Sequence, residues 1–473
     1  MTTAMITSKN VSFRYPHEQE PFLQNINLEI QPGECVLICG HSGSGKTTFS
    51  RLLNGLSPNY IPGELQGEVT TNGLLAGQAA IEDYVPVVGS VFQNPKTQYF
   101  TATVKDELAF PLENSGIAPV EIVQKVQQTA AEFHIAHLLD RQMFSLSGGE
   151  QQQIALAAAT ILHPKVLVLD EVSSNLDDQA ITRLTTNIRS QKAAGVTIIL
   201  TEHRLAWTTS FVDRYVLFQN GALTQTWTKQ EFLSLSQAKL HDLGLRAVDL
   251  TAQRQALAAK TYQPNTSLVD QTKTFAARQL TIGYQPKQVL TELSFGLKPH
   301  QVTGVIGPNG VGKSTLAKTL TGLLKPMAGQ ILWHGHTLSA KELLKKSFLV
   351  MQNTNYQLFC ESVEEEVLLH AKYPERKDEL LTQLNLAKFA QRHPLSLSAG
   401  QQQRVVIAAA LMSGKELLIF DEPTSGLDYA NLQRFGDLLQ LLKQTETLIV
   451  VITHDLELSA GWCDQVIQLR STI

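Results

Sequence analysis

Two segments of the chain have the residue types and spacing of a phosphate-binding loop. The first reads GHSGSGKTT from Gly40 to Thr48, and the second reads GPNGVGKST from Gly307 to Thr315. Glycines at these positions let successive backbone N–H groups point at a phosphate, and a helix that starts here adds partial positive charge. The lysine pairs with β- and γ-phosphate oxygens, and the next hydroxyl binds Mg²⁺. The sequence therefore predicts two sites for a nucleoside triphosphate.

Each phosphate loop is followed, further along the chain, by an apolar run that ends in a pair of acids. The pairs are Asp170–Glu171 and Asp421–Glu422. In such a pair the aspartate orients the ligands of Mg²⁺, while the glutamate polarises the attacking water as a general base. The predicted catalytic bases are Glu171 and Glu422, and the predicted Mg²⁺ ligands are Thr47, Asp170, Ser314 and Asp421.

Two further polar residues recur after the phosphate loops. His203 and His454 follow another β-rich run, and they are expected to orient water near the γ-phosphate. Gln93 and Gln352 lie in segments that read VFQN and VMQN, and they are expected to touch Mg²⁺ or water from a mobile loop. All four join the predicted catalytic set.

An aromatic residue precedes each phosphate loop. Tyr15 lies ahead of Gly40, and Tyr284 lies ahead of Gly307 at a similar but slightly shorter separation. Each ring can stack on a nucleotide base, and each can equally be an ordinary aromatic residue at the rim of the core.

The motifs recur in the same order and at matching distances. The step from Ser147 to Asp170 equals the step from Ser398 to Asp421, and each aspartate precedes its histidine by the same interval. The stretch between the phosphate loop and the serine is longer in the first copy than in the second. The chain therefore contains two copies of one domain in tandem, and the extra residues are expected in surface loops.

Apolar runs and helical periodicity indicate how these residues are positioned. Short β-rich runs precede the loops, the acid pairs and the histidines, and stretches of helical periodicity lie between them. This order predicts an α/β fold of βαβ units with ligand groups at the carboxyl ends of parallel strands. The predicted strands are Cys35 to Cys39, Val166 to Leu169, Val196 to Leu200, Val302 to Ile306, Leu417 to Phe420 and Thr447 to Ile452, and the helices include Ala180 to Ala194 and Asn431 to Thr445.

The length and composition of the chain are those of a globular protein with several domains. It has 473 residues, 43% of them hydrophobic and 17% charged, and a net charge of −4. That charge makes nucleic acid an unexpected partner. The four cysteines form no metal-binding or disulfide pattern, and the N-terminus lacks a signal peptide, so a reducing cytoplasm is expected. The predicted domains are 1–235 and 273–473, joined by a near-neutral, partly helical linker at 236–272.

At the segment LSGGE, from Leu146 to Glu150, the chain resembles the nucleotide-binding domains of the ABC superfamily. The resemblance implies tandem P-loop NTPase domains, each with a RecA-like parallel sheet, an antiparallel β subdomain and a helical subdomain. It also implies hydrolysis of ATP with Mg²⁺, and a head-to-tail arrangement in which each signature segment caps the nucleotide of the other copy. The implied nucleotide contacts are Tyr15, Gly40, His41, Ser42, Gly43, Ser44, Gly45, Lys46, Thr47, Thr48, Ser147, Gly148, Gly149, Tyr284, Gly307, Pro308, Asn309, Gly310, Val311, Gly312, Lys313, Ser314, Thr315, Ser398, Ala399 and Gly400.

The two copies depart from the family pattern in different places. Ala399 stands where the signature has a glycine, which would penalise a positive φ. The first copy reads DEVSSNLD from Asp170, where the second reads DEPTSGLD from Asp421. We expect modest asymmetry between two active sites.

The segment after Val91 resembles that of one class within the superfamily. FQNPKTQYF followed by TVKDELAF is similar to the ATPases of energy-coupling factor (ECF) importers, and Gln98 and Gln357 match a glutamine typical of that class. Lys96 stands at a typical aspartate, and Thr354 and Asn355 replace proline and aspartate. Fused tandem ATPases of this class resemble those that import thiamine precursors, vitamins and related micronutrients.

The ECF resemblance implies partners in the membrane. A transmembrane coupling subunit would dock on this loop, and a separate membrane subunit would bind the transported solute, so the chain would sit peripherally on the cytoplasmic face. The acids Asp106, Glu107 and Glu364 to Glu366 can receive basic groups of that partner, or they can form a solvated helix face.

Two other functions fit the tandem motifs. One is the ATPase of a sugar importer, and the other is a soluble tandem-ABC factor that acts on ribosomes. The paired glutamines favour the ECF class over the first. The second class carries a long basic linker, whereas residues 236–272 hold four basic and three acidic residues.

Overall fold

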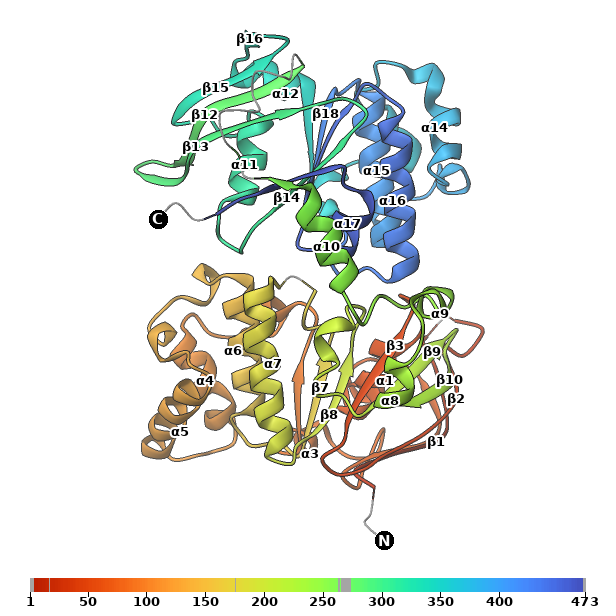
Figure 1. Ribbon diagram of the computed structural model, residues 1–473. Helices are drawn as coiled ribbons and strands as arrows, with labels where there is room; N and C mark the ends of the chain where they lie inside the picture. The colour runs from red at the N-terminus through yellow and green to blue at the C-terminus, as the bar shows by residue number, and fades with distance from the viewer. Residues whose placement is uncertain (1–3, 17, 175, 263, 265–273, 471–473) are drawn as a thin grey trace. The chain divides into compact units, whose positions relative to one another are not determined.

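The computed structural model describes residues 4–16, 18–174, 176–262, 264 and 274–470 (Figure 1). The chain divides into two compact units, of which the first is Met1–Asp249 with Gly426–Ala430 and the second is Leu250–Ser425 with Asn431–Ile473. Asn175 of the DEVSSNLD segment and the predicted boundary between residues 272 and 273 lie outside the described residues.

The first unit is built around a largely parallel sheet. Its strand order is β10-β9-β3-β8-β7-β6, and only β10 runs antiparallel to its neighbour. The strands are β3 (Cys35–Gly40), β6 (Val88–Val91), β7 (Val166–Asp170), β8 (Thr197–Thr201), β9 (Arg214–Gln219) and β10 (Ala222–Thr228).

A smaller antiparallel sheet accompanies it, in the order β2-β1-β4-β5. Its strands are β1 (Ile6–Arg14), β2 (Leu23–Ile30), β4 (Glu64–Thr71) and β5 (Leu74–Leu75). The helices of the first unit are α1 (Lys46–Leu53), α2 (Leu56–Asn59), α3 (Ile81–Tyr84), α4 (Val104–Asn114), α5 (Pro119–Glu132), α6 (Gly148–Thr160), α7 (Asp178–Ala193), α8 (Lys229–Leu233) and α9 (Gln237–Asp242).

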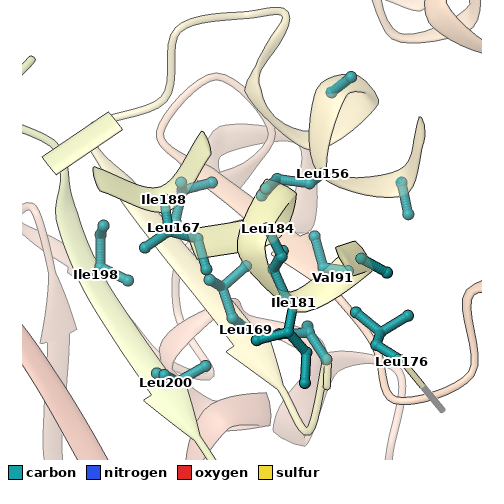
Figure 2. Packing of buried hydrophobic residues seen from close by; sticks show 14 of the residues in the cluster. Val91, Leu156, Leu167, Leu169, Leu176, Ile181, Leu184, Ile188, Ile198 and Leu200 are labelled. Carbon is teal, nitrogen blue, oxygen red and sulfur yellow. The ribbon is translucent and has the colours of Figure 1, made fainter. Parts of the chain in front are cut away.

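Both faces of the first parallel sheet are buried, because successive side chains of a strand point to opposite faces. Leu167 and Leu169 of β7 join a core with α6 and α7, which Figure 2 shows around Leu156, Ile181 and Leu184. Val166 and Val168 join a second core, with residues of α1 and the antiparallel sheet. The sheet is thus fixed between two layers, and its carboxyl ends are held in place.

The second unit repeats this plan. Its parallel sheet has the order β11-β20-β14-β19-β18-β17, and its antiparallel sheet has the order β13-β12-β15-β16. The strands are β11 (Thr261–Tyr262), β12 (Phe275–Tyr284), β13 (Lys287–Leu297), β14 (Val302–Ile306), β15 (Ala328–Trp333), β16 (His336–Thr337), β17 (Ser347–Val350), β18 (Leu417–Asp421), β19 (Leu448–Ile452) and β20 (Gln465–Gln468).

The helices of the second unit include two long ones that follow the signature segment and the acid pair, α15 and α16 (Figure 1). The helices are α10 (Thr251–Lys260), α11 (Lys313–Leu320), α12 (Ala340–Lys346), α13 (Val363–Leu368), α14 (Lys377–Gln383), α15 (Ala399–Met412), α16 (Tyr429–Lys443) and α17 (Leu456–Trp462).

The described part of residues 236–272 carries secondary structure that belongs to both units. Leu240 of α9 is buried in the first core, whereas α10 packs on α17 of the second unit. Lys260 Nζ donates hydrogen bonds to the carbonyls of Ala460 at 2.7 Å and Cys463 at 3.0 Å. The strand β11 then pairs in parallel with β20 at the edge of the second sheet.

The fold class predicted from the sequence is confirmed. Every predicted strand is present within one residue at each end, and the predicted helices correspond to α7 and α16, each of which starts two residues earlier. Among the described residues, no helix combines the length and the apolar character that crossing a membrane requires.

Candidate functional site

The first phosphate loop connects β3 to α1. Its tight turn places Gly45 at φ 102°, and a Cβ atom there would lie 2.5 Å from Leu23 Cδ2, so only glycine fits. Lys46 Nζ donates hydrogen bonds to the carbonyls of Gly40 at 3.0 Å and His41 at 2.9 Å. Burial lowers the pKa of Lys46, although Glu171 and other nearby acids oppose the shift. The loop carbonyls thus hold the ammonium group of Lys46 in place.

A hydroxyl and a carboxylate meet beside this loop. Thr47 Oγ1 donates a hydrogen bond to Asp170 Oδ1 at 3.2 Å, and the Thr201 hydroxyl bonds the same oxygen. Burial raises the pKa of Asp170, and these hydroxyls partly offset the rise. A buried carboxylate with a hydroxyl alongside is a ligand pair that suits Mg²⁺ when phosphates complete the shell.

Glu171 lies next, in a backbone conformation that non-glycine residues seldom adopt. Its φ is 48°, and its N–H donates to the Thr201 carbonyl at 3.0 Å. The carboxylate lies 3.1 Å from His203 Nε2 and accepts a hydrogen bond from Gln93 Nε2 at 2.6 Å. Burial raises the pKa of Glu171, but His203 and Lys46 outweigh it, so the pKa lies below the ordinary value.

The second phosphate loop connects β14 to α11 and repeats this geometry. Gly312 has φ 108°, and a Cβ there would lie 2.6 Å from Val289 Cγ1. Lys313 Nζ donates to the carbonyls of Gly307 at 2.9 Å and Pro308 at 3.1 Å, and it lies 2.9 Å from His454 Nε2. The lysine ammonium group therefore bonds to the corresponding two loop carbonyls in each unit.

The second acid pair also keeps the arrangement of the first. Burial raises the pKa of Asp421, opposed by a hydrogen bond from Ser314 and by the charge of Lys313. Glu422 has φ 49°, and its carboxylate lies 3.3 Å from His454 Nε2. The same ring nitrogen lies 2.7 Å from Asn309 Oδ1.

The two predicted tyrosines differ in exposure between the units. Tyr15 is half-buried, its hydroxyl is hydrogen-bonded to that of Thr48 at 2.9 Å, and its ring packs edge-on against Phe13. Tyr284 is 51% exposed. Gln93 and Gln352 are both exposed, and Gln93 donates its hydrogen bond to Glu171 as described.

The signature segments form helix starts. Ser147 caps α6, where its N–H and hydroxyl both donate to Glu150 Oε2, at 2.8 and 2.7 Å. A Cβ at Gly149 would lie 2.8 Å from Ala180 Cβ, whereas a Cβ at Gly148 would have nothing within 4 Å. The close contact of α6 with α7 therefore requires glycine only at 149.

The second signature helix, α15, begins at the position where a family glycine is replaced. The Ser398 N–H donates to Gln401 Oε1 at 3.0 Å, and Ala399 is the first residue of α15. A helical residue has a negative φ, so the positive-φ penalty expected for Ala399 does not arise. The contact of each signature segment with the opposite phosphate loop stays a prediction.

Two supporting residues in the sites have no counterpart of the same type in the other copy. Thr201, which bonds Asp170, aligns with Ile452, and Asn309, which contacts His454, aligns with Ser42. Because neither residue type recurs in the other copy, the internal repeat gave no signal for them.

The donor set fits ATP with Mg²⁺. In the described part of the chain, no group of three or more His, Cys, Asp or Glu side chains could hold a metal ion. The hydroxyl and the aspartate of each site can supply two ligands, and the phosphate oxygens of ATP can supply others. Mg²⁺ binds in this way, through one or two carboxylates together with substrate phosphates.

The chain is similar to two proteins of known sequence and to one solved structure. A Treponema denticola protein, provisionally named an ABC transporter ATP-binding protein, is 39% identical over 98% of this chain and 95% of its own length. A Bacillus subtilis protein, provisionally named the HMP/thiamine import ATP-binding protein YkoD, is 30% identical over 99% and 88%. The structure of cbiO1 from Clostridium perfringens, part of the ABC transporter complex cbiONQ, is 26% identical with a TM-score of 0.44, and the match covers 49% of this chain and 91% of that one.

The ABC transporter family profile matches residues 23–174 and 290–425. Each matched segment contains one phosphate loop and one acid pair of the geometry described above. The chain therefore belongs to the ABC transporter family, as an ATP-binding protein with two fused ATP-hydrolysing domains.

Proposed function

We propose that this chain is the energy-coupling ATPase of an ECF-type importer for a vitamin, a thiamine precursor or another micronutrient. The similarity to the Bacillus subtilis protein, whose name refers to HMP/thiamine import, supports the solute class. The observation that carries the proposal is a loop that both units build in the same way and that presents an exposed aromatic side chain.

The loop after β6 is held by its own glutamine. Gln98 Oε1 accepts a hydrogen bond from the Phe92 N–H at 2.7 Å, and its Nε2 donates to the Ser90 carbonyl at 2.9 Å. In the second unit Gln357 makes the corresponding bonds to Met351 at 2.8 Å and Leu349 at 2.7 Å. The ECF-type glutamines thus set the shape of the loop, and its other side chains are left to contact a partner.

A buried glutamate from the following helix holds the other end of each loop. Glu107 accepts from the N–H groups of Phe100 at 3.2 Å and Thr101 at 3.0 Å. Glu366 accepts from those of Phe359 at 2.6 Å and Cys360 at 2.8 Å. These two acids were expected to face a partner or solvent, but the free N–H groups of the loop draw them inward.

Three aromatic side chains of these loops face solvent, whereas the Tyr99 hydroxyl donates to the Gln151 carbonyl at 2.7 Å. Phe100 is 74% exposed and stacks on Phe110 of α4, with ring centroids 5.0 Å apart. Phe359 is 78% exposed and Tyr356 is 73% exposed. Rigidly presented aromatic side chains are typical anchors of protein interfaces. We assign them to the docking of a transmembrane coupling subunit, which would work with a solute-binding membrane subunit at the cytoplasmic face.

Within each nucleotide site, the geometry supports the following roles. Lys46 and Lys313 hold the phosphates, and Glu171 and Glu422 accept the proton of the attacking water, each oriented by its histidine. Mg²⁺, held by the hydroxyl–aspartate pairs, would neutralise phosphate charge. Binding of ATP would bring each signature segment onto the opposite nucleotide, and hydrolysis would release it, which would move the docked membrane subunit.

Isolation of the chain from detergent-extracted membranes of its source cells tests the partner assignment. We expect hydrophobic membrane proteins to copurify, and the substitutions Phe100→Asp and Phe359→Asp together to reduce their yield by about tenfold or more. Tyr60→Asp is the matched control, because Tyr60 is 71% exposed but lies outside either loop. With this control variant, the yield of copurified membrane proteins should equal that obtained with the unaltered chain.

The solute is then identified by reconstituting the copurified complex and measuring ATP-dependent uptake of labelled thiamine precursors, vitamins and sugars. Uptake of sugars alone would support the sugar-importer alternative. Salt-sensitive association with ribosomes, without membrane proteins, would overturn the importer assignment.

A further inference from the structure

A buried glutamate beside the first nucleotide site has no assigned role. Glu202 directly follows β8 and is only 2% exposed. Both of its carboxyl oxygens contact Ser173: Oε1 lies 2.9 Å from the Ser173 nitrogen, and Oε2 lies 2.8 Å from the Ser173 hydroxyl. An ionisable side chain at such depth needs partners of this kind to be tolerated.

The Glu202–Ser173 pair connects the two turns that carry the proposed base and its histidine. Ser173 lies two positions after Glu171, and Glu202 immediately precedes His203. Glu171 and His203 are themselves 3.1 Å apart. The turn after β7 and the turn after β8 are therefore joined at two points, one at the proposed base and one buried beside it.

The second unit joins the corresponding turns with different residues. Thr424 aligns with Ser173, and its hydroxyl donates a hydrogen bond to Asp455 Oδ2 at 3.0 Å. Both side chains are buried. Asp455 follows His454, whereas Glu202 precedes His203. The carboxylate thus comes from opposite sides of the histidine in the two units, yet it holds the same position of the turn.

The different position of the carboxylate changes the structure that follows each histidine. Asp455 also caps α17, where Oδ1 accepts from the N–H groups of Glu457 at 3.1 Å and Leu458 at 3.2 Å. The first unit has Arg204 at that position, and its segment forms only the short 3₁₀ helix Ala206–Thr208. Arg204 Nη1 donates instead to the carbonyls of Ser173 at 3.3 Å and Leu176 at 3.1 Å. Arg204 in the first unit and Asp455 in the second thus both bond to the turn that follows the acid pair.

We propose that Glu202 is a positioning residue of the first site, which keeps Glu171 against His203 by holding Ser173, and that Asp455 does the same for Glu422 by holding Thr424. This rests on the proposed roles of Glu171 and Glu422 as bases. A base must be held within hydrogen-bond reach of the water that it activates, and a small displacement lowers the rate of the chemical step.

The ionisation of Glu202 bears on the choice of variant. Burial raises the pKa of Glu202 to about 8, with a contribution from the charge of Glu171, while Ser173 and Arg204 oppose the rise. A protonated carboxyl has one accepting and one donating oxygen, as the amide of glutamine has an accepting oxygen and a donating nitrogen. Glutamine can therefore replace Glu202 without losing either contact to Ser173.

The test measures ATP turnover of the full-length chain in the Glu422→Gln background, where hydrolysis reports the first site. We expect Glu202→Ala to lower kcat by about tenfold, with nucleotide Kd changed by less than about threefold. Glu202→Gln should keep kcat within about threefold of the background. If Glu422→Gln alone abolishes turnover, the two sites act together, and the same comparison is made in the otherwise unaltered chain.

The companion variant is Thr424→Val in the Glu171→Gln background, which removes the hydroxyl at constant volume and should lower kcat at the second site. A merely structural role for Glu202 would lower the melting temperature and nucleotide affinity along with kcat. The proposal is overturned if kcat is unchanged in Glu202→Ala, or if Glu202→Gln loses as much turnover as Glu202→Ala.

The outcome is separable from that of the proposed function. Absence of membrane partners would contradict the importer assignment and leave these turnover measurements unaffected. Unchanged turnover in Glu171→Gln would remove the assigned base itself, whichever way Glu202 behaves.

Discussion

The two nucleotide sites share one set of contacts but differ in what supports it. In both units the proposed base has a left-handed backbone and a carboxylate within 3.3 Å of a histidine Nε2. The lysine of each loop lies beside the same nitrogen, at 3.4 Å in the first unit and 2.9 Å in the second. The geometry around the proposed base is thus duplicated closely.

The supports around this set are not duplicated. The first unit holds the turn after its acid pair through Glu202, whereas the second unit holds the corresponding turn through Asp455 and places Asn309 beside its histidine. The comparison teaches that the positions of the proposed reacting groups are constrained more tightly than the residues that fix them.

The largest effect is expected from removal of the two bases. Glu171→Gln and Glu422→Gln should each lower hydrolysis at their own site by about a hundredfold or more and leave ATP bound there, because an amide cannot accept the proton. Turnover and retained nucleotide are the measurements, with the exposed Glu82→Gln as control. Unchanged hydrolysis in both single variants and in the double variant would break the assignment.

The signature helices give a comparison of stability. Gly149→Ala should destabilise the first unit by about 1–3 kcal/mol, because its Cβ would lie 2.8 Å from Ala180 Cβ. Gly148→Ala, which copies the residue of the second unit, should change stability by less than about 0.5 kcal/mol, since nothing lies within 4 Å of its Cβ. Denaturant unfolding measures both, and equal losses would contradict the packing described here.

The stability of the chain should depend on pH through Glu202 of the first unit. Burial raises the pKa of Glu202 from 4.5 to about 8, so the folded chain binds this proton more tightly than the unfolded chain. The stability that it contributes is complete below about pH 4.5 and is lost as the pH rises to 8. We therefore expect the melting temperature of Glu202→Gln to rise relative to that of the unaltered chain as the pH is raised from about 5 to about 8.5. A constant difference would show that Glu202 does not titrate in this window.

The smallest effect concerns the histidine contact of the second site. Asn309→Ser gives that position the residue of the first unit and removes the 2.7 Å contact with His454. In the Glu171→Gln background we expect turnover to fall by about threefold, the scale of one hydrogen bond. Ser42→Asn in the Glu422→Gln background is the reciprocal change, and a larger loss there than in Asn309→Ser would show that the supports are not interchangeable.

Much of the fold could be predicted because strong local signals coincide. The run before Asp170 is apolar throughout, as expected for a strand that is buried on both faces, and a glycine-rich loop after such a strand admits few alternatives. The acid pair and histidine were found because their spacing recurs in both copies.

Other features depend on contacts that a sequence repeat does not record. Glu107 has the side chain of a typical surface residue, and its burial is explained by the donors of the neighbouring loop, which are two N–H groups and the Thr101 hydroxyl. The contacts of Glu202 and Asp455 could not be matched by alignment, because the two carboxylates occupy different positions around their histidines.

The strand β11 and helix α10 have a practical consequence for dissecting the chain. Because β11 extends the sheet of the second unit and Lys260 attaches α10 to the carbonyls of Ala460 and Cys463, a fragment that starts after residue 272 would lack an edge strand and its covering helix. A separately expressed C-terminal half should begin near Leu250, where the compact unit starts. Cutting later would leave the hydrogen-bonding edge of β20 open to self-association.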